Sequence, residues 1–561
     1  MTRRLAVLLL ALIGLAWYGL LPRAPLPTAA PGAGQITARG AYHIHSNRSD
    51  GSGTIAEIAE AARRAGLQFI IVTDHGDGTR EPDAPQYRHG VLVIDAVELS
   101  TTGGHLVALG LPATPYPFAG TPADVMADVG RLGGFGIAAH PDSPRAALRW
   151  AAWEVPADGL EWINADSGWR DEPAAALARA LLGFPLRPAS AVASLLDRPV
   201  DLLARWDAMG TTRSVPALAA ADAHARLGAD DPAPSALHLP LPGYETVFRT
   251  FSNHVVLDQA LTGSGQADAA AVLAAVRQGR VFTVVDAIAT PGELTFAADT
   301  AGGTARMGEV VPAGAVTLRA RVNGPTGTTL VLLKDGKVIR EAGAAELAVA
   351  IGESGVYRVE AHVAGTSGKP PVPWILSNPI YVGLARAGRA ATPIPAPLSR
   401  IPARTPEAVV EHGAGDVSEL VDVRLADARE RRLAGEQPIG WRFVLSPGVP
   451  AGQFAAVQLP VAGGLAAFDR VRFMVSSAAP VRAWVQLRGG QASERWGKTF
   501  YADGEPRLVE LSLRDFPPIG ATSTAAPPLE RIESLLFVVD TLNHRPGASG
   551  SITLSEIAFV R

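Results

Sequence analysis

The stretch GAYHIHSNRSDG, residues 40–51, sets two histidines one residue apart in an alternating run. In an extended strand, side chains two residues apart share a face, so His43 and His45 point in one direction. The Ser-Asp-Gly that follows is typical of a turn, which brings Asp50 back over the strand end. Such a group can bind a metal ion, although an isolated pair of histidines also fits a half-buried strand with ordinary polar residues.

The composition narrows the possible functions. With 561 residues the chain is too long for one core, and its length predicts about three domains. The net charge of -4 gives no basic excess, so no nucleic-acid contact is expected. Cysteine is absent, which excludes disulfides, thiolate metal sites and a cysteine-linked lipid anchor. Any metal site must therefore use His, Asp and Glu.

The start of the chain resembles a targeting segment. Two arginines precede an uncharged run, Leu5–Leu21, made mostly of Leu, Ala, Ile and Val. This pattern predicts an exported protein, periplasmic or at the cell surface. The run is long for a cleaved signal peptide and short for a membrane span; we interpret it as a retained anchor, with cleavage as the alternative. Residues 22–38 are rich in Pro, Ala and Gly and predict a tether, so that 1–38 precedes the folded domains.

From residue 39 the chain alternates helical and extended patterns. Ile55, Ile58 and Ala62 have helical spacing, and the apolar QFIIVTDH, residues 68–75, follows as a buried strand. Further strands are expected in VLVIDAVELS, HLVALGL, GFGIAAHP, GLEWIN and SVPALAAADAH. This rhythm predicts an α/β barrel or a doubly wound sheet over residues 39–290.

Metal-binding residue types follow the apolar runs. In a parallel α/β barrel the carboxyl ends of the strands meet at one rim, where sites are built. His105 is an exception, because it opens its run. The candidate ligands are His43, His45, Asp50, His75, Glu98, His105, His140, Asp222 and His224. Nine ligands exceed the needs of one ion, so two or three metals are expected, with a bridging carboxylate such as Glu98.

At these positions the chain resembles the polymerase and histidinol phosphatase (PHP) superfamily. The matching pieces, in the family's order, are HIHSNRSDG, IIVTDHGD, AVELSTTGGHLVALG, GIAAHPDSP and AADAHA. The resemblance covers residues 39–290 and implies a distorted (β/α)7 barrel with a trinuclear metal cluster. It assigns His43, His45, Glu98 and Asp222 to one metal, Glu98, His105 and His140 to a second, and Asp50, His75 and His224 to a third. Asp74 is expected to act in catalysis by orienting a ligand histidine or a bound water.

This cluster predicts ester hydrolysis. Two cations that share a water lower its pKa, and the bridging hydroxide attacks a bond that the same ions polarise. Manganese, zinc or iron suits such ligands. PHP relatives imply a small phosphorylated substrate, and Arg48, Arg145 and Arg226 are either substrate contacts or solvated charges.

Two alternatives to phosphoester hydrolysis remain open. Exported PHP proteins with β-rich extensions resemble carbaryl-hydrolase-type metallohydrolases, which implies a carbamate or carboxylic ester substrate for the same cluster. The other alternative is a non-enzymatic binding protein of the cell envelope. The complete ligand set argues against that reading, because a relic site would be expected to have lost a member.

Beyond the first domain the pattern becomes β-rich. Residues 291–384 predict an immunoglobulin-like β-sandwich, and 385–405 predict a linker rich in Pro, Ala and Arg. Residues 406–561 contain at least seven short strands and predict a galactose-binding-like jelly roll, which is a second β-sandwich. Three of its aromatic residues either contact carbohydrate or else fill the core or cover the first domain's barrel; they are Trp484, Trp496 and Tyr501.

Overall fold

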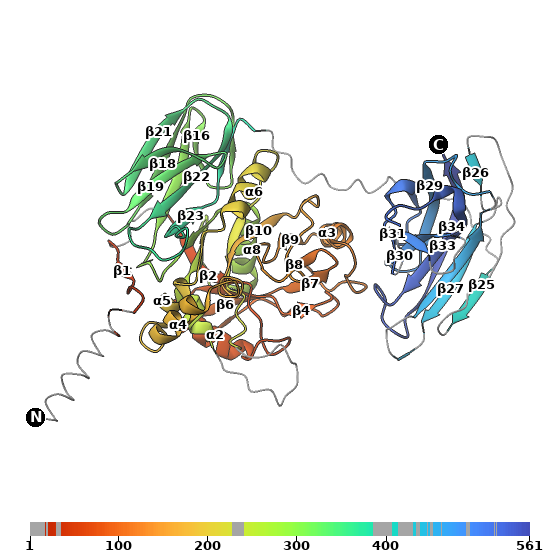
Figure 1. Cartoon of the computed structure of the whole chain (residues 1–561), viewed down its shortest axis with the longest axis horizontal. Coiled ribbons are helices and arrows are strands. Elements are labelled where there is room, and N and C mark those ends of the chain that lie inside the picture. Colours follow the sequence, from red (N-terminus) through yellow and green to blue (C-terminus); the bar gives the residue numbers. More distant parts are fainter. Residues whose placement is uncertain are drawn as a thin grey trace, which may run out of the picture. The chain divides into compact units, whose positions relative to one another are not determined.

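The computed structural model describes part of the chain, and this part forms two compact units (Figure 1). The described residues are 17, 19, 21–29, 35–226, 241–384, 407–412, 430–432, 438–445, 447–448, 453–461, 463–489, 494–520, 522 and 524–561. Unit 1 comprises Met1–Pro112 and Thr121–Ala390, and unit 2 comprises Ala113–Gly120 and Ala391–Arg561. Most of the predicted signal segment and the predicted linker 385–405 lie outside the described residues. No described helix is both long enough and apolar enough to cross a membrane.

The first sheet of unit 1 contains three parallel strands, and the ends of two of them carry the first predicted ligands. Strand β2 (Thr37–Tyr42) pairs in parallel with β3 (Phe69–Val72), and β3 pairs in parallel with β6 (Val91–Asp95). Between β2 and β3 lies helix α2 (Ile55–Arg64), which the spacing of its apolar residues predicts. Thr54 accepts a hydrogen bond from the backbone of Glu57, and Glu57 accepts one from the backbone of Thr54, which gives the helix a capping box.

A second sheet carries the remaining strand ends. Its order is β11 (Ala217–Ala220), β10 (Gly159–Asn164), β9 (Phe135–Ala138), β8 (Gly104–Leu109), β7 (Val97–Thr101) and β4 (His75–Gly76). The pairing of β3 with β6 continues as the parallel pairing of β4 with β7. At the other edge, the amide of Ala221 donates to the carbonyl of Tyr42 over 2.8 Å. Both edges of the second sheet, β11 and β4, are therefore connected to strands of the first sheet.

The strand directions in the second sheet are mixed. Strand β8 is antiparallel to both β7 and β9, whereas β9, β10 and β11 are parallel. Helix α3 (Pro122–Arg131) packs on β8 and β9, and α8 (Gly265–Arg277) packs on β6. The mixed helix and strand architecture is confirmed, and the exact (β/α)7 barrel stays a prediction.

The predicted immunoglobulin-like segment is joined to the first domain by a continuous sheet. From β2 this sheet passes through β12 (Ser252–Val256), β13 (Val281–Val284), β23 (Ile375–Ser377) and β22 (Gly355–His362). A four-stranded sheet packs over it to form a sandwich core, in the order β16 (Gly303–Arg306), β15 (Leu294–Thr300), β18 (Val316–Val322) and β21 (Glu346–Ile351). One sheet thus contains strands from both sides of the predicted domain boundary at residue 291, and this boundary stays a prediction.

Buried charges also join these two parts of unit 1. Arg358, on β22, is 1% exposed and binds both carboxylate oxygens of Asp207, at 2.7 and 2.8 Å. Asp207 lies on α6 (Val200–Gly210). Glu360 accepts a further hydrogen bond from Arg358 at 2.5 Å. Because an unpaired buried charge is costly, this cluster fixes the contact between α6 and β22.

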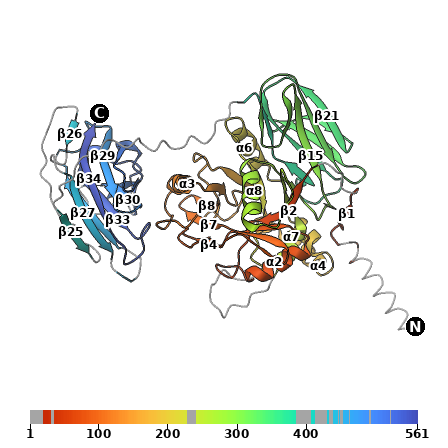
Figure 2. The ribbon, with the colours of Figure 1, turned by 180° about the vertical axis from the view of Figure 1, so that it is seen from behind.

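Residues 22–29, predicted as part of a tether, pair with other segments of unit 1 instead. Strand β1 (Leu26–Pro27) pairs in parallel with β14 (Ala289–Thr290), and the hydroxyl of Thr28 donates to the carbonyl of Pro291 over 2.5 Å. Figure 2 shows β1 beside the strands of the sandwich. The composition of this segment is typical of a flexible linker, but its backbone hydrogen bonds fix it to the fold.

Unit 2 is a β-sandwich, as predicted. One sheet contains β25 (Glu407–His412), β27 (Ile439–Leu445), β34 (Ser549–Val560), β29 (Arg470–Ser477) and β32 (Arg507–Ser512), with β26 (Glu430–Arg432) paired to β34. The other contains β28 (Phe454–Pro460), β33 (Ile532–Asp540), β30 (Val481–Gly489) and β31 (Arg495–Ala502). Both sheets contribute to one apolar core. The galactose-binding-like jelly roll stays a prediction.

The three aromatic residues considered for carbohydrate binding differ in exposure. Trp496 is fully buried in the core, and its indole donates to the carbonyl of Thr524 over 2.9 Å. The core-filling alternative therefore holds for Trp496. Trp484 and Tyr501 are half-buried, and Tyr501 donates to Asp503 over 3.1 Å.

Candidate metal centre

The structure brings all nine candidate ligands together in four overlapping groups. In each group, one ligand atom per residue lies within 4.8 Å of the others. The groups are His45, Asp50, His75 and His224; His43, Glu98 and His140; His43, His45 and Asp222; and His75, Glu98 and His105. Because the groups share His43, His45, His75 and Glu98, they form one continuous centre.

Three of these residues have a strained backbone at the end of a strand. The φ angles are 63° at His43, 30° at His140 and 41° at Asp222. Residues other than glycine rarely adopt this left-handed region, and such conformations concentrate at functional sites. The strain therefore points to the same place as the ligand chemistry.

Glu98 lies in the middle of the centre and is fully buried. Its Oε1 lies 2.8 Å from Nδ1 of His105 and 2.8 Å from Nε2 of His140. Its Oε2 lies 3.2 Å from Nε2 of both His43 and His45. Both oxygens thus face imidazole nitrogens, as a carboxylate shared by two ions would require.

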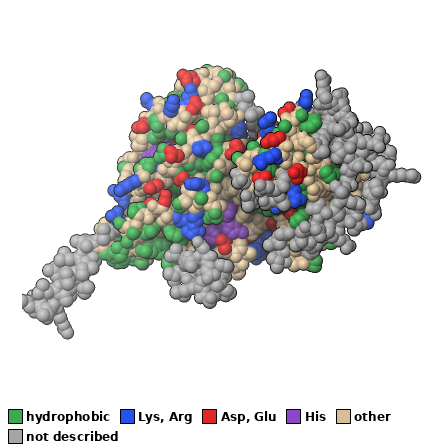
Figure 3. Space-filling view, turned by 45° about the vertical axis from the view of Figure 1, so that its right-hand side comes forward, with side chains coloured by type: hydrophobic (Ala, Val, Ile, Leu, Met, Phe, Trp, Pro, Cys, Tyr) green, Lys and Arg blue, Asp and Glu red, His purple; other side chains and the backbone are tan. Residues whose placement is uncertain are grey.

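One side of the centre is open to solvent. The side chains of Asp50, His75 and His224 are 46%, 34% and 21% exposed. Oδ2 of Asp50 lies 3.5 Å from Nε2 of His75 and 3.2 Å from Nε2 of His224. Figure 3 shows histidine side chains that reach the surface as one group. A small molecule could approach the centre from this side.

The charges within the centre are strongly coupled. Burial alone would raise the pKa of Glu98, but the surrounding histidines, His43 foremost, hold it well below the usual range. Burial alone would lower the pKa of His43, but the carboxylates of Glu161, Asp222 and Glu98 raise it well above the usual range. The buried carboxylates therefore require positive charge beside them, which protons or divalent cations can supply.

Two residues that were not predicted from the sequence, Glu161 and Asn164, contact the ligands on their buried side. Glu161 is fully buried on β10 and accepts from the backbone amide of His140 over 2.7 Å. Asn164 donates to Glu161 over 3.2 Å and to Asp222 over 3.0 Å. The available signal was a carboxylate inside the apolar run GLEWIN, which is otherwise an unfavourable place for a charge.

Asp74 holds the loop that carries the open-side ligands. Its Oδ1 accepts from the amide of Ser46 and the hydroxyl of Ser49, both over 2.7 Å, and its Oδ2 accepts from the hydroxyl of Ser46 over 2.6 Å. These contacts position the loop before Asp50. The expected action of Asp74 on a histidine or a water stays a prediction.

Tyr244 binds the same loop, and Gly51 permits its tight turn. The hydroxyl of Tyr244 donates to the carbonyl of His45 over 2.8 Å and accepts from the amide of Gly53 over 3.0 Å. A Cβ atom at Gly51 would lie 2.2 Å from the carbonyl oxygen of His45. The turn can therefore close over the strand end only with glycine at this position.

The three arginines near the ligands differ in their contacts. Arg48 forms ion pairs with Asp83 and, at 3.5 Å, with Asp95. Arg226 donates to the backbone carbonyl of Asp50 over 3.4 Å, which places its guanidinium beside the open side. The backbone amide of Arg145 donates to the hydroxyl of Ser143 over 3.3 Å.

The donor set fits divalent transition metals. It offers only imidazole nitrogens and carboxylate oxygens, a combination suited to manganese, zinc or iron. Outer partners such as Glu161 orient the imidazoles, as expected around a metal. The residues present therefore fit the two or three ions predicted from the sequence.

Comparisons with known proteins give distant structural likenesses. No family model matches the chain, and no curated protein matches its sequence. The chain is similar to a two-domain protein from Bacteroides vulgatus containing a predicted PHP-like metal-dependent phosphoesterase, with 14% identity over 64% of this chain and 99% of that chain, and a TM-score of 0.28. It is also similar to a family 11 carbohydrate-binding module from Clostridium thermocellum, with 13% identity over 22% of this chain and 85% of that chain, and a TM-score of 0.17.

Proposed function

We propose that the protein is a metal-dependent hydrolase of ester bonds, most simply a phosphoesterase of the PHP type with three ions in a distorted (β/α)7 barrel. The observation that carries the proposal is that nine His, Asp and Glu side chains lie together in one centre. This centre is buried on one side and open to solvent on the other. The proposed ligand assignment is the one that the PHP resemblance implies.

The residues of the chain divide the work. Glu98 and the buried histidines would hold the metal cations in a fixed position. Asp50, His75 and His224 face the side from which a substrate arrives. Divalent cations held by this set would supply an activated water and polarise the ester oxygens. Because Glu161 and Asn164 fix the ligands before substrate binds, little reorganisation is needed during the reaction.

The substrate class depends on the charges around the open side. Arg226, beside Asp50, could pair with a phosphate, which favours a phosphoester. Arg48 is already paired with Asp83 and Asp95, which leaves less positive charge for a phosphate and favours the second candidate, a carbamate or carboxylic ester. A binding protein without activity fits less well, because all nine candidate ligands remain together.

We also propose where the protein works. The uncharged run Leu5–Leu21 would anchor an exported chain in a membrane, with the folded units in the periplasm or at the cell surface. Carbohydrate contact through unit 2 would use Trp484 or Tyr501, since Trp496 is buried.

Metal analysis paired with turnover assays tests the proposed activity. Purified protein should contain two to three equivalents of manganese, zinc or iron by plasma mass spectrometry. It should cleave p-nitrophenyl phosphate or bis-p-nitrophenyl phosphate, whereas cleavage of p-nitrophenyl acetate alone would select the second candidate. His75→Ala and Asp222→Ala should abolish turnover, and His89→Ala, at an exposed histidine outside the centre, serves as the matched control. Absence of metal after reconstitution would end the proposal.

A further inference from the structure

Helix α4 (Ala174–Gly183) is apolar but poorly buried. Its sequence is AAALARALLG, yet only Ala180 and Gly183 are buried. Leu181 and Leu182 are 62% and 51% exposed, and Leu186, just after the helix, is 56% exposed. Single exposed leucines are common, but three large ones on one short segment form a patch that suggests a partner.

The patch is continuous with the apolar run near the start of the chain. The indole of Trp17, which belongs to the run Leu5–Leu21, donates to the carbonyl of Leu182 over 3.1 Å. Trp17 is itself 38% exposed. Trp17 therefore lies on α4, and in the sequence the rest of the uncharged run precedes it.

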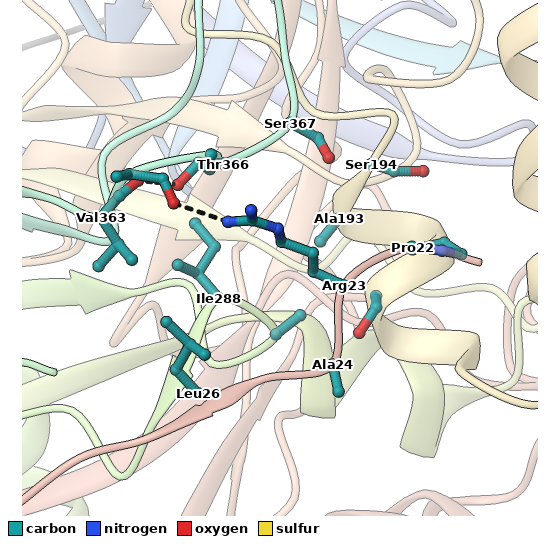
Figure 4. Close-up of a pocket in the computed structure, with 14 residues that line it drawn as sticks. Pro22, Arg23, Ala24, Leu26, Ala193, Ser194, Ile288, Val363, Thr366 and Ser367 are labelled. Carbon is teal, nitrogen blue, oxygen red and sulfur yellow. Dashed lines mark hydrogen bonds between the residues drawn. The ribbon is translucent and has the colours of Figure 1, made fainter. Parts of the chain in front are cut away.

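The segment after the run is fixed to unit 1. Arg187 donates to the carbonyl of Pro22 over 2.6 Å, and Arg23 donates to the carbonyl of Ala364 over 2.9 Å. Figure 4 shows Arg23 extended between the end of helix α5 (Pro188–Ala193), next to Ser194, and the loop at Thr366. With β1 paired to β14, these contacts hold the exit of the apolar run beside α4.

We propose that the exposed face of α4, together with Trp17, lies on the surface of the lipid bilayer that holds the run Leu5–Leu21. The inference rests on the anchor proposed above and deepens it. Because residues 22–27 are bound to unit 1, the anchor would also restrict the orientation of unit 1 at the membrane. Leucines beside a tryptophan suit the boundary between acyl chains and headgroups, and the exposed Arg179 suits lipid phosphates. Unit 1 is thereby held against the membrane in one orientation.

Site-specific fluorescence on the full chain tests this orientation. The chain contains no cysteine, so Ala178→Cys and Ala348→Cys each provide one labelling site for an environment-sensitive nitrobenzoxadiazole (NBD) dye. Both alanines are exposed; Ala178 lies one turn before Leu181 and Leu182 on α4, and Ala348 lies on β21 of the sandwich. The protein is reconstituted in vesicles of phosphatidylcholine and phosphatidylglycerol, with flotation as a separate measure of anchoring.

The expected result is a blue shift of the dye at residue 178, with quenching by doxyl-labelled lipids, and neither effect at residue 348. The combined variant Leu181→Ser, Leu182→Ser and Leu186→Ser should abolish the effect at 178 while flotation persists. A chain that floats without a response at 178 would overturn the docking face and leave the anchor intact. A chain that does not float would overturn both. A response at 178 without vesicles would show that the chain itself or a second copy covers the patch, which also overturns the proposal.

Discussion

Oε1 of Glu161 lies 2.5 Å from Nδ1 of His43, deep behind the metal centre. This contact directs the opposite nitrogen, Nε2, toward Glu98, which lies 3.2 Å away. A carboxylate behind a ligand histidine fixes the tautomer of the ring and raises its basicity. Glu161 is therefore a positioning residue for the centre.

Replacing Glu161 should weaken metal binding without removing a ligand. We expect Glu161→Ala to lower the affinity for zinc or manganese by about 10- to 100-fold, because His43 loses its orienting partner. Competition with a chelating dye measures the affinity. Glu245→Gln, which alters a surface carboxylate paired with Arg64 and Arg249, is the matched control. Unchanged affinity in Glu161→Ala would contradict the positioning role.

The turn at Gly51 should be required for the open side of the centre. In Gly51→Ala the new Cβ would meet the carbonyl of His45, so the loop must shift and carry Asp50 away from His75 and His224. We expect the loss of one metal equivalent by plasma mass spectrometry. Gly343→Ala, where a Cβ would meet nothing within 4 Å, should keep the full complement. Retention of all the metal in Gly51→Ala would show that the loop adapts.

Arg358 should matter strongly for stability. Its removal leaves the buried carboxylates of Asp207 and Glu360 uncompensated, so Arg358→Ala should lower the free energy of unfolding of unit 1 by about 3–5 kcal/mol. Urea unfolding followed by fluorescence measures this loss. The control is Arg319→Ala, which removes an exposed pair with Asp299 and should have a much smaller effect, because solvent screens this pair. Equal effects of the two variants would contradict the prediction.

His254 should make stability depend on pH. Burial, together with the charge of Arg39, lowers the pKa of His254 to about 3, from an ordinary value of 6.5. The unfolded chain therefore binds a proton that the folded chain excludes between these two values. This stabilising contribution is complete above pH 6.5 and is lost as the pH falls toward 3, by up to about 1.4 kcal/mol per pH unit.

A variant without the imidazole isolates this contribution. His254→Gln should lower the slope of unfolding free energy against pH between 6.5 and 4, measured by urea titrations at several pH values. Phe282→Leu, which alters the ring stacked on His254 without removing a titrating group, should change stability by a similar amount at every pH. The prediction fails if wild type and His254→Gln have the same slope.

His254 shows where sequence and structure agree. A lone histidine on a predicted strand favours packing over a place in the site, and its buried position on β12, stacked on Phe282 at 4.9 Å, places it in the core. For Glu161 the sequence offers only a carboxylate inside the apolar run GLEWIN, which marks an unusual position but does not reveal its role. Its role arises from contacts with His43 and His140, which lie 118 and 21 residues away.

The sequence by itself determined the local features of this protein. Apolar periodicity predicted helix α2 and the strands before the ligands, and residue types predicted which side chains could meet at a metal. Only the tertiary structure decided that one sheet continues from β2 to β22, that residues 22–29 are docked, and that α4 exposes its leucines. Periodicity acts over a few residues, whereas pairing and burial depend on which distant segments compete for the same surface.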